Sequence, residues 1–309
     1  MEKGINSSFK IESVVWALLS LILTLAYAHF FSLWVAGYFL GILTTFSLTL
    51  LCWRAGRFGF VGVLLLAGLF CALGRSNSVI FLLKSLLPSL ILGSGLKYRK
   101  RPDLVIFSAA IPQLAILGLW VVHYSEMAYF LGFQLQDMTA QIADQARGWG
   151  MDIGFLVEKA GPLSDLLSQL FFGFQFLSGL FEIFLVYLLI GLLAGKLGWN
   201  MVKLPPFYRW RSEQSLAWVF LLSSVLFLVG GEFFEIVSKN ILLVLGFWYA
   251  VLGFSISEWF LRESKASGSR IGFYIFMVLT QILSFVLLLL VGFFDSWLDF
   301  RKLSQKAMA

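Results

Sequence analysis

Apolar residues in this chain are gathered into nine long runs, and the short segments between them hold most of the charged residues. Most runs have the roughly 17 to 25 residues needed to cross a hydrocarbon core of about 30 Å. Each run must be helical, because backbone groups that face lipid find hydrogen-bond partners only within their own helix. The runs cover residues 12–31, 33–53, 58–74, 78–96, 104–124, 165–195, 215–231, 240–261 and 271–294.

This pattern predicts an all-α fold: a polytopic integral membrane bundle of about eight to nine transmembrane helices that forms one domain over residues 1–309. The alternative of eight arises between His29 and Trp34, where only a tight turn fits between the first two runs and one of them could be re-entrant.

The long connection over residues 125–163 carries a helical periodicity of its own. Within 127–149, apolar residues recur at spacings of three, four or seven, as on one face of a helix. The apolar positions are Leu131, Leu135, Met138, Ile142 and Trp149, and the other side holds Gln134, Asp137, Gln141 and Asp144. We predict an amphipathic helix, which either covers an outward-facing cavity or rests at the lipid interface.

Basic residues in the connecting segments predict the orientation, because Lys and Arg are enriched in cytoplasmic loops. With a cytoplasmic N-terminus, the inside segments hold 15 Lys and Arg residues, including four in Lys97–Arg101 and four in the basic loop 196–214. The outside segments hold 7, including those of loop 125–163 and of the tail that begins at Arg301. We therefore expect the N-terminus to be cytoplasmic and loop 125–163 to be extracytoplasmic, although the basic tail disagrees with the rest of the count.

Two charged residues, Lys84 and Glu182, fall near the middle of apolar runs. A charge at that depth costs about 2.5–3.5 kcal/mol on insertion scales, so we expect both side chains to face the bundle interior and to meet. Ser168, Gln175 and Glu182 share one helical stripe. One hypothesis is a midplane cavity in which Glu182, Lys84, Gln175 and Ser168 bind a substrate or ion; the other is a buried pair that fixes helix packing.

Composition and motifs exclude other classes of function. The net charge of +6 comes from Lys and Arg at the ends of apolar runs and not along one face, so we expect no nucleic-acid partner. Two Cys and two His residues are too few for a zinc or haem site, and we expect no metal or cofactor. The chain contains none of the nucleophile-elbow, zinc-protease or phosphate-loop motifs, and we expect no enzymatic activity.

Three short motifs stand out in the C-terminal half. They are Leu204-Pro205-Pro206-Phe207 with Trp210; Asn240 followed by Leu245-Gly246-Phe247-Trp248-Tyr249 and Gly253; and Gly292 to Lys302, which contains Asp295 and Arg301. In these motifs and in its span pattern the chain resembles the YybS-like family of uncharacterised bacterial membrane proteins, domain of unknown function 2232. The resemblance marks as family residues Pro205, Pro206, Asn240, Tyr249, Gly253, Asp295 and Arg301.

That family is itself similar to the substrate-binding S-components of energy-coupling-factor transporters and to the rod-shape protein MreD. The resemblance implies a multi-pass protein of the bacterial inner membrane that binds a small solute or lipid-like ligand in a transport role. The alternative it implies is a scaffold or regulator that recruits membrane-protein partners, as MreD does. The first apolar run lacks the Ala-x-x-x-Ala motif by which S-components dock on their coupling partner.

Overall fold

The computed structural model describes residues 14–26, 34–72, 82–122, 154–263 and 267–301, together with the single residues 137, 140, 141, 145 and 148. Every regular element in these ranges is a helix, which agrees with the predicted all-α membrane protein. The chain divides into two compact units. Unit 1 comprises Met1–His123 and Gln175–Leu204, and unit 2 comprises Tyr124–Phe174 and Pro205–Ala309.

Within the described ranges, four helical stretches are long and apolar enough to cross a membrane: Tyr38–Gly56, Asp165–Lys196, Phe233–Glu263 and Gln281–Leu298. Shorter apolar helices are Val14–Ala26, Pro102–Leu114, Gln214–Val229 and Arg270–Leu279. All of these coincide with predicted apolar runs, while the total of eight to nine crossings stays a prediction.

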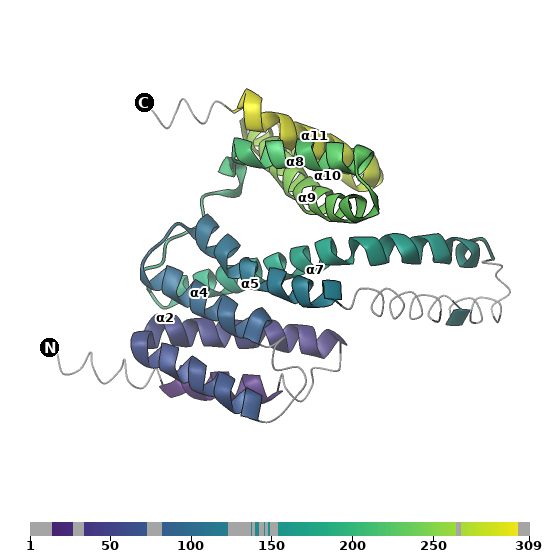
Figure 1. Cartoon of the computed structure of the whole chain (residues 1–309). Coiled ribbons are helices and arrows are strands. Elements are labelled where there is room, and N and C mark those ends of the chain that lie inside the picture. The colour runs from purple at the N-terminus through teal and green to yellow at the C-terminus, as the bar shows by residue number, and fades with distance from the viewer. Residues whose placement is uncertain are drawn as a thin grey trace. The chain divides into compact units, whose positions relative to one another are not determined.

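Unit 1 contains the helices drawn in purple and blue in Figure 1, together with the second part of α7. Its labelled elements are α2 (Trp34–Ala72), the π-helical turn η1 (Leu82–Leu86), α4 (Leu87–Lys97), α5 (Pro102–Val122) and α7 (Gly154–Lys196) from Gln175 onward. One apolar core joins α2, α4, α5 and α7 through residues such as Leu50, Leu92, Ala109 and Ile183.

The chain reverses direction inside α2, at the position where the sequence predicts a short loop between two runs. Gly56 has φ 58° and ψ −123°, a conformation that a side chain would strain. A Cβ atom at Gly59 would lie 2.1 Å from the carbonyl oxygen of Leu51, so only glycine allows the two arms to touch there. Val63 of the second arm then packs against Leu48 and Leu51 of the first.

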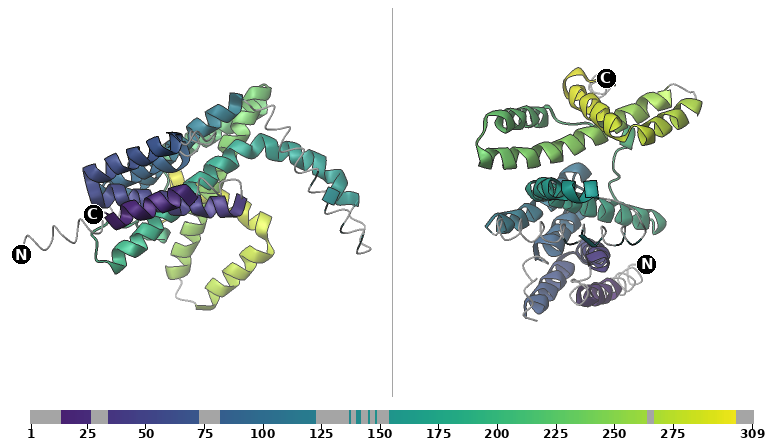
Figure 2. Two further views of the ribbon diagram at one scale, coloured as in Figure 1. Left: turned by 90° about the horizontal axis from the view of Figure 1, so that it is seen from below. Right: turned by 90° about the vertical axis from the view of Figure 1, so that its right-hand side faces the viewer.

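Unit 2 contains the helices of the second half of the chain, drawn in green and yellow in Figures 1 and 2. They are the short 3-10 helix η2 (Phe207–Arg209), α8 (Gln214–Val229), α9 (Glu232–Glu263), α10 (Ser267–Leu279), α11 (Gln281–Leu298), and α7 up to Phe174. α8 and α9 form a hairpin, and α11 packs against the middle of α9. Their shared core includes Ala217, Tyr249 and Phe293.

Two predicted boundaries in unit 2 are wrong. The run 271–294 is divided at Thr280, whose φ of −112° interrupts the helix between α10 and α11. Residues 232–239, predicted as a loop because they are charged, form the start of α9. Glu235 and Lys239 pair there one turn apart, so the charges stabilise the helix and do not end it.

The predicted amphipathic helix can be followed only on its polar side. Asp137, Gln141 and Gln145 are helical and exposed. Gln141 Nε2 donates to Asp137 Oδ2 at 2.9 Å, as neighbours four apart on a helix do. The apolar positions lie outside the described residues.

The C-terminal end of α11 lies beside the segment that precedes α8, which bears on the side of the tail that the charge count left open. Asp299 Oδ2 lies 3.7 Å from Arg211 Nη2, and Arg301 donates to the backbone carbonyls of Tyr208 and Trp210. Groups in direct contact are expected on one side of a membrane, so these contacts favour a tail on the same side as Arg211. This is the point at which the basic tail disagreed with the rest of the charge count.

We predict that the basic loop and the tail are labelled from the same side of the membrane. In a chain whose Cys52 and Cys71 are replaced by Ser, single cysteines at Lys203 and Lys302 should react alike with a membrane-impermeant maleimide. A cysteine at Gln141 serves as the marker for the opposite side. If Lys203 and Lys302 positions react from opposite faces, the contacts of Arg301 do not exist in the membrane.

Candidate functional site

Unit 1 buries an ion pair between two helices that are far apart in the sequence. Glu182 of α7 is fully buried, and its Oε2 lies 3.7 Å from the Lys84 Nζ in η1. Lys84 retains 17% side-chain exposure. The two charges therefore lie inside the unit and near each other, as predicted. The reason for the prediction was the free-energy cost of exposing either charge to lipid.

A local departure from α-helical geometry positions Lys84. Pro88 has no backbone N–H, so it cannot donate to the carbonyl four residues earlier, which belongs to Lys84. The chain instead forms the π-helical turn Leu82–Leu86, in which carbonyls bond five residues ahead. The Lys84 ammonium also lies 5.3 Å from the centre of the Tyr38 ring, a cation–π contact with α2.

Hydroxyl groups of α2 face this pair, and the sequence reading missed them. Thr45 Oγ1 lies 3.5 Å from Glu182 Oε1 and also donates to the Gly41 carbonyl at 2.9 Å. The Thr45 carbonyl accepts from Ser89 Oγ at 3.1 Å, which ties α4 to α2. Ser85, one turn before Ser89, is fully buried, and its hydroxyl has no hydrogen-bond partner among the described residues.

An amide from α5 lies against the face of α7 that carries Glu182. Gln113 is almost fully buried and lies directly against Gly179, where a Cβ atom would come within 1.2 Å of its Oε1. Gly179 precedes Glu182 by three residues and so shares its helix face. Gln113 Nε2 donates to nothing in the described part of the chain.

We define the Lys84–Glu182 cluster as Thr45, Lys84, Ser85, Gln113 and Glu182. Two of the four predicted ligand-binding residues belong to it, and no contact between described residues joins the other two to it. Ser168 lies in the unit 2 part of α7, and its hydroxyl donates to the Asp165 carbonyl at 2.8 Å. Gln175 is half-buried. Ser168, Gln175 and Glu182 all lie in α7, as the sequence predicts, but Ser168 belongs to unit 2 and the other two belong to unit 1.

The cluster offers one cation, one carboxylate, one amide and two hydroxyls within a bundle of four helices. These groups can bind a polar molecule by charge and by hydrogen bonds. Among the described residues, no group of three or more His, Cys, Asp and Glu side chains is placed to hold a metal ion.

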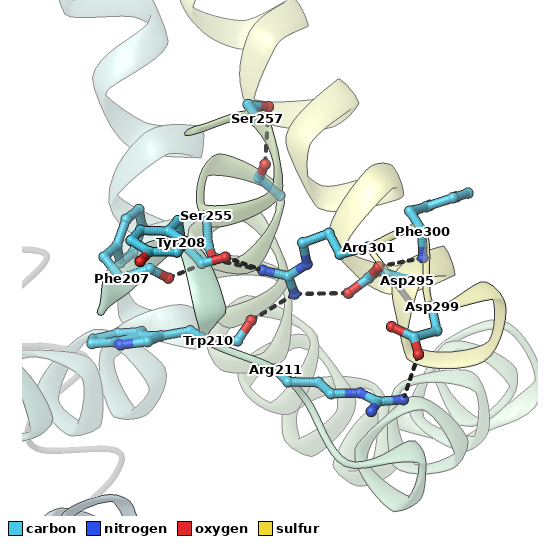
Figure 3. Close-up of polar contacts among 11 residues, drawn as sticks. Phe207, Tyr208, Trp210, Arg211, Ser255, Ser257, Asp295, Asp299, Phe300 and Arg301 are labelled. Carbon is cyan, nitrogen blue, oxygen red and sulfur yellow. Dashed lines mark hydrogen bonds and ion pairs between the residues drawn. The ribbon is translucent and has the colours of Figure 1, made fainter. Parts of the chain in front are cut away.

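Unit 2 has a different buried charge, Arg301, whose partners are all provided by the protein (Figure 3). Nη1 donates to the Tyr208 carbonyl at 2.8 Å and to Ser255 Oγ at 3.0 Å. Nη2 donates to the Trp210 carbonyl at 2.6 Å and to Asp295 Oδ2 at 2.9 Å. We call this set the Arg301 network. It joins the segment before α8 to α9 and α11.

The other family residues also hold unit 2 together. Pro206 precedes η2, and the Pro205 carbonyl accepts from the Trp210 indole at 3.0 Å. A Cβ atom at Gly253 would lie 2.0 Å from a backbone oxygen of α11, so glycine permits the contact of α9 with α11. Tyr249 is fully buried in the same core.

Asn240 connects α9 to the first part of α7 through its amide. Nδ2 donates to the Gln169 carbonyl, and Oδ1 accepts from the Gly173 N–H, both at 2.6 Å. In an undisturbed α-helix these two backbone groups bond to each other. The side chain of Asn240 therefore spans a turn of the α7 backbone.

Comparison with known proteins supports the membrane assignment. A family model described as "Predicted membrane protein (DUF2232)" matches residues 18–296, which is most of the 309-residue chain. No curated protein and no solved structure matches the chain.

We predict that Arg301→Met destabilises the protein by about 3–5 kcal/mol, because it leaves Asp295 buried and unpaired. Arg301→Met with Asp295→Asn should cost less than the single change. The matched control is Arg262→Met, which removes a half-exposed partner of Glu258 in the same unit and should cost about 1 kcal/mol or less. Reversible unfolding in detergent micelles measures the free energy of unfolding of all three variants. Equal losses of stability for Arg301→Met and Arg262→Met would contradict the role of the network.

Proposed function

The chain belongs to this family of predicted membrane proteins, and we propose that it binds a small polar solute at the Lys84–Glu182 cluster and takes part in solute transport. The proposed role is non-catalytic. It matches the S-component-like function that the family resemblance implies.

The observation that carries this proposal is the incomplete pairing of the cluster. The Lys84–Glu182 contact of 3.7 Å is an ion pair without a close hydrogen bond, and Glu182 Oε2 accepts none among the described residues. Gln113 Nε2 and Ser85 Oγ are buried and unpartnered in the same part of the chain. Each such group costs about 1–3 kcal/mol if nothing bonds to it, so their collection beside a charge pair favours a ligand as the missing partner.

The geometry also limits the class of solute. Lys84 is the partly exposed member of the pair and can attract an anionic group, while Glu182 and Gln113 lie deeper. A small molecule with an anionic or acceptor group at one end and a donor at the other would satisfy both sides. A purely apolar ligand would leave every one of these groups unpaired.

The proposed setting is the bacterial inner membrane with a cytoplasmic N-terminus, as the loop charges favour. The contacts of Arg301 with the segment before α8 favour the same side for the start of the tail, which supports the alternative of eight crossings.

We predict different outcomes for single and double changes of the pair. Glu182→Gln or Lys84→Met alone leaves one charge without its partner and should lower thermal stability, whereas the double change should restore much of it. Solute released on denaturing the purified protein, measured by mass spectrometry, should fall more than tenfold in the double variant. The reason is that a hydrogen bond to a charged group is worth about 1.5–3 kcal/mol.

The matched control is Glu235→Gln with Lys239→Met, which removes the same residue types from unit 2 and should leave solute retention unchanged. A stable double variant at positions 84 and 182 that keeps its solute would make the pair purely structural. Wild-type protein that carries no solute but reproducibly retains protein partners would favour the scaffold alternative. Strictly additive effects of the two changes would mean that Lys84 and Glu182 do not meet.

A further inference from the structure

The turn between α4 and α5 concentrates positive charge beside a groove. Four of its five residues, Lys97 to Arg101, are basic and all five are exposed. Asp103 accepts from one of them, Arg101, at 2.6 Å, and both side chains are more than half exposed, so this ion pair is weak. The structure gives no ion pair with a described acidic residue for the other three basic residues of the turn, Lys97, Arg99 and Lys100.

The backbone of this turn holds a basic residue where glycine is favoured. The Lys100 N–H bonds to the Gly95 carbonyl and the Arg99 N–H to the Leu96 carbonyl, which is the Schellman arrangement of a helix C-terminus. Its left-handed position is normally glycine, but here it is Arg99 with φ 49°. The left-handed conformation is unfavourable for a residue with a side chain, so a charge is present where the fold alone would favour glycine.

The groove opens from the turn and runs between the two helices, with a volume of about 450 Å³. Tyr98, Lys100 and Arg101 line its end at the turn, and Ile91, Leu104 and Val105 line its apolar part. Ser94 and Ser108 add hydroxyls along the walls. A basic end that continues into an apolar channel matches a molecule with an anionic head and a hydrocarbon tail.

We infer that this α4–α5 groove binds an anionic phospholipid, with the phosphate at Lys100 and Arg101 and the upper part of an acyl chain against Leu104 and Val105. Basic clusters at the ends of membrane helices attract anionic headgroups. A free phosphate would use only the basic end, and a zwitterionic lipid would gain little from it. This site is separate from the Lys84–Glu182 cluster, and its test does not depend on the proposed function.

The test is native mass spectrometry of the full chain in mild detergent, titrated with phosphatidylglycerol or with phosphatidylcholine of the same acyl chains. The wild type should retain one phosphatidylglycerol at concentrations where phosphatidylcholine is lost. Lys100→Gln with Arg101→Gln should weaken that retention about tenfold, because both headgroup charges are removed. The matched control, Lys196→Gln with Lys203→Gln, removes two exposed charges outside the groove and should have no effect.

A second variant fills the groove without changing any charge. Ser108→Trp should displace the lipid, whereas Ile111→Trp, at an exposed position on α5 outside the groove, should not. Equal retention of the two lipids by the wild type would overturn the inference. Equal losses of lipid in the two charge variants would also overturn it. Displacement of the lipid by millimolar inorganic phosphate, together with no effect of Ser108→Trp, would indicate a site for free anions and not for a lipid.

Discussion

A charge inside a membrane protein must find partners, because neither lipid nor a closed helix backbone can provide them. This constraint explains why Glu182, in the middle of an apolar run, is buried and contacts η1 and α2. It also explains why Arg301, just beyond the last apolar helix, turns back to the segment before α8. In both units, the buried charge determines which helices must lie together.

Arg301 and Glu182 find their partners in different ways. The difference distinguishes a charge that holds helices together from a charge that can bind a ligand. Arg301 donates four hydrogen bonds to two carbonyls, a hydroxyl and a carboxylate, and among the described residues its Nε–H alone of the guanidinium nitrogens has no partner. Glu182 has a distant ammonium and a long contact with Thr45, and its Oε2 has no hydrogen-bond partner among the described residues. A charge with four close hydrogen bonds holds helices together, whereas a charge with only long contacts at the same depth is expected to be completed by something else.

Sequence reasoning predicted the features that carry a large energetic penalty. The helices, the turn near Gly56 and the meeting of Lys84 with Glu182 all follow from the cost of placing polar groups in hydrocarbon. Thr45 and Gln113 were missed because a threonine hydroxyl can bond to its own helix and an amide carries no charge, so neither is conspicuous in an apolar run. Ser168 lies on the same helical stripe as Glu182 but in the unit 2 part of α7, and a stripe does not show where a helix passes from one unit to the next.

The side of the tail stayed open at the sequence level for a related reason. Loop-charge counting assigns sides from basic residues and takes each apolar run as one crossing. Arg301 bonds to two backbone carbonyls, and every residue has such a carbonyl, so no sequence pattern indicates these bonds. The family residues likewise appeared as separate short motifs, although in the structure Pro205, Asp295 and Arg301 belong to one connected region of unit 2 through Trp210.

The central claim is that Lys84 and Glu182 meet inside the membrane, and a carbodiimide tests it on the unaltered chain. Treating native membranes with a membrane-permeant carbodiimide activates buried carboxyl groups, and an adjacent amine then forms an amide with loss of water. Peptide mass spectrometry should find Glu182 linked to Lys84, with the half-buried Glu235–Lys239 pair as a positive control for the chemistry. If Glu182 is activated but remains unlinked, or is joined to a different lysine, the account of this site is wrong.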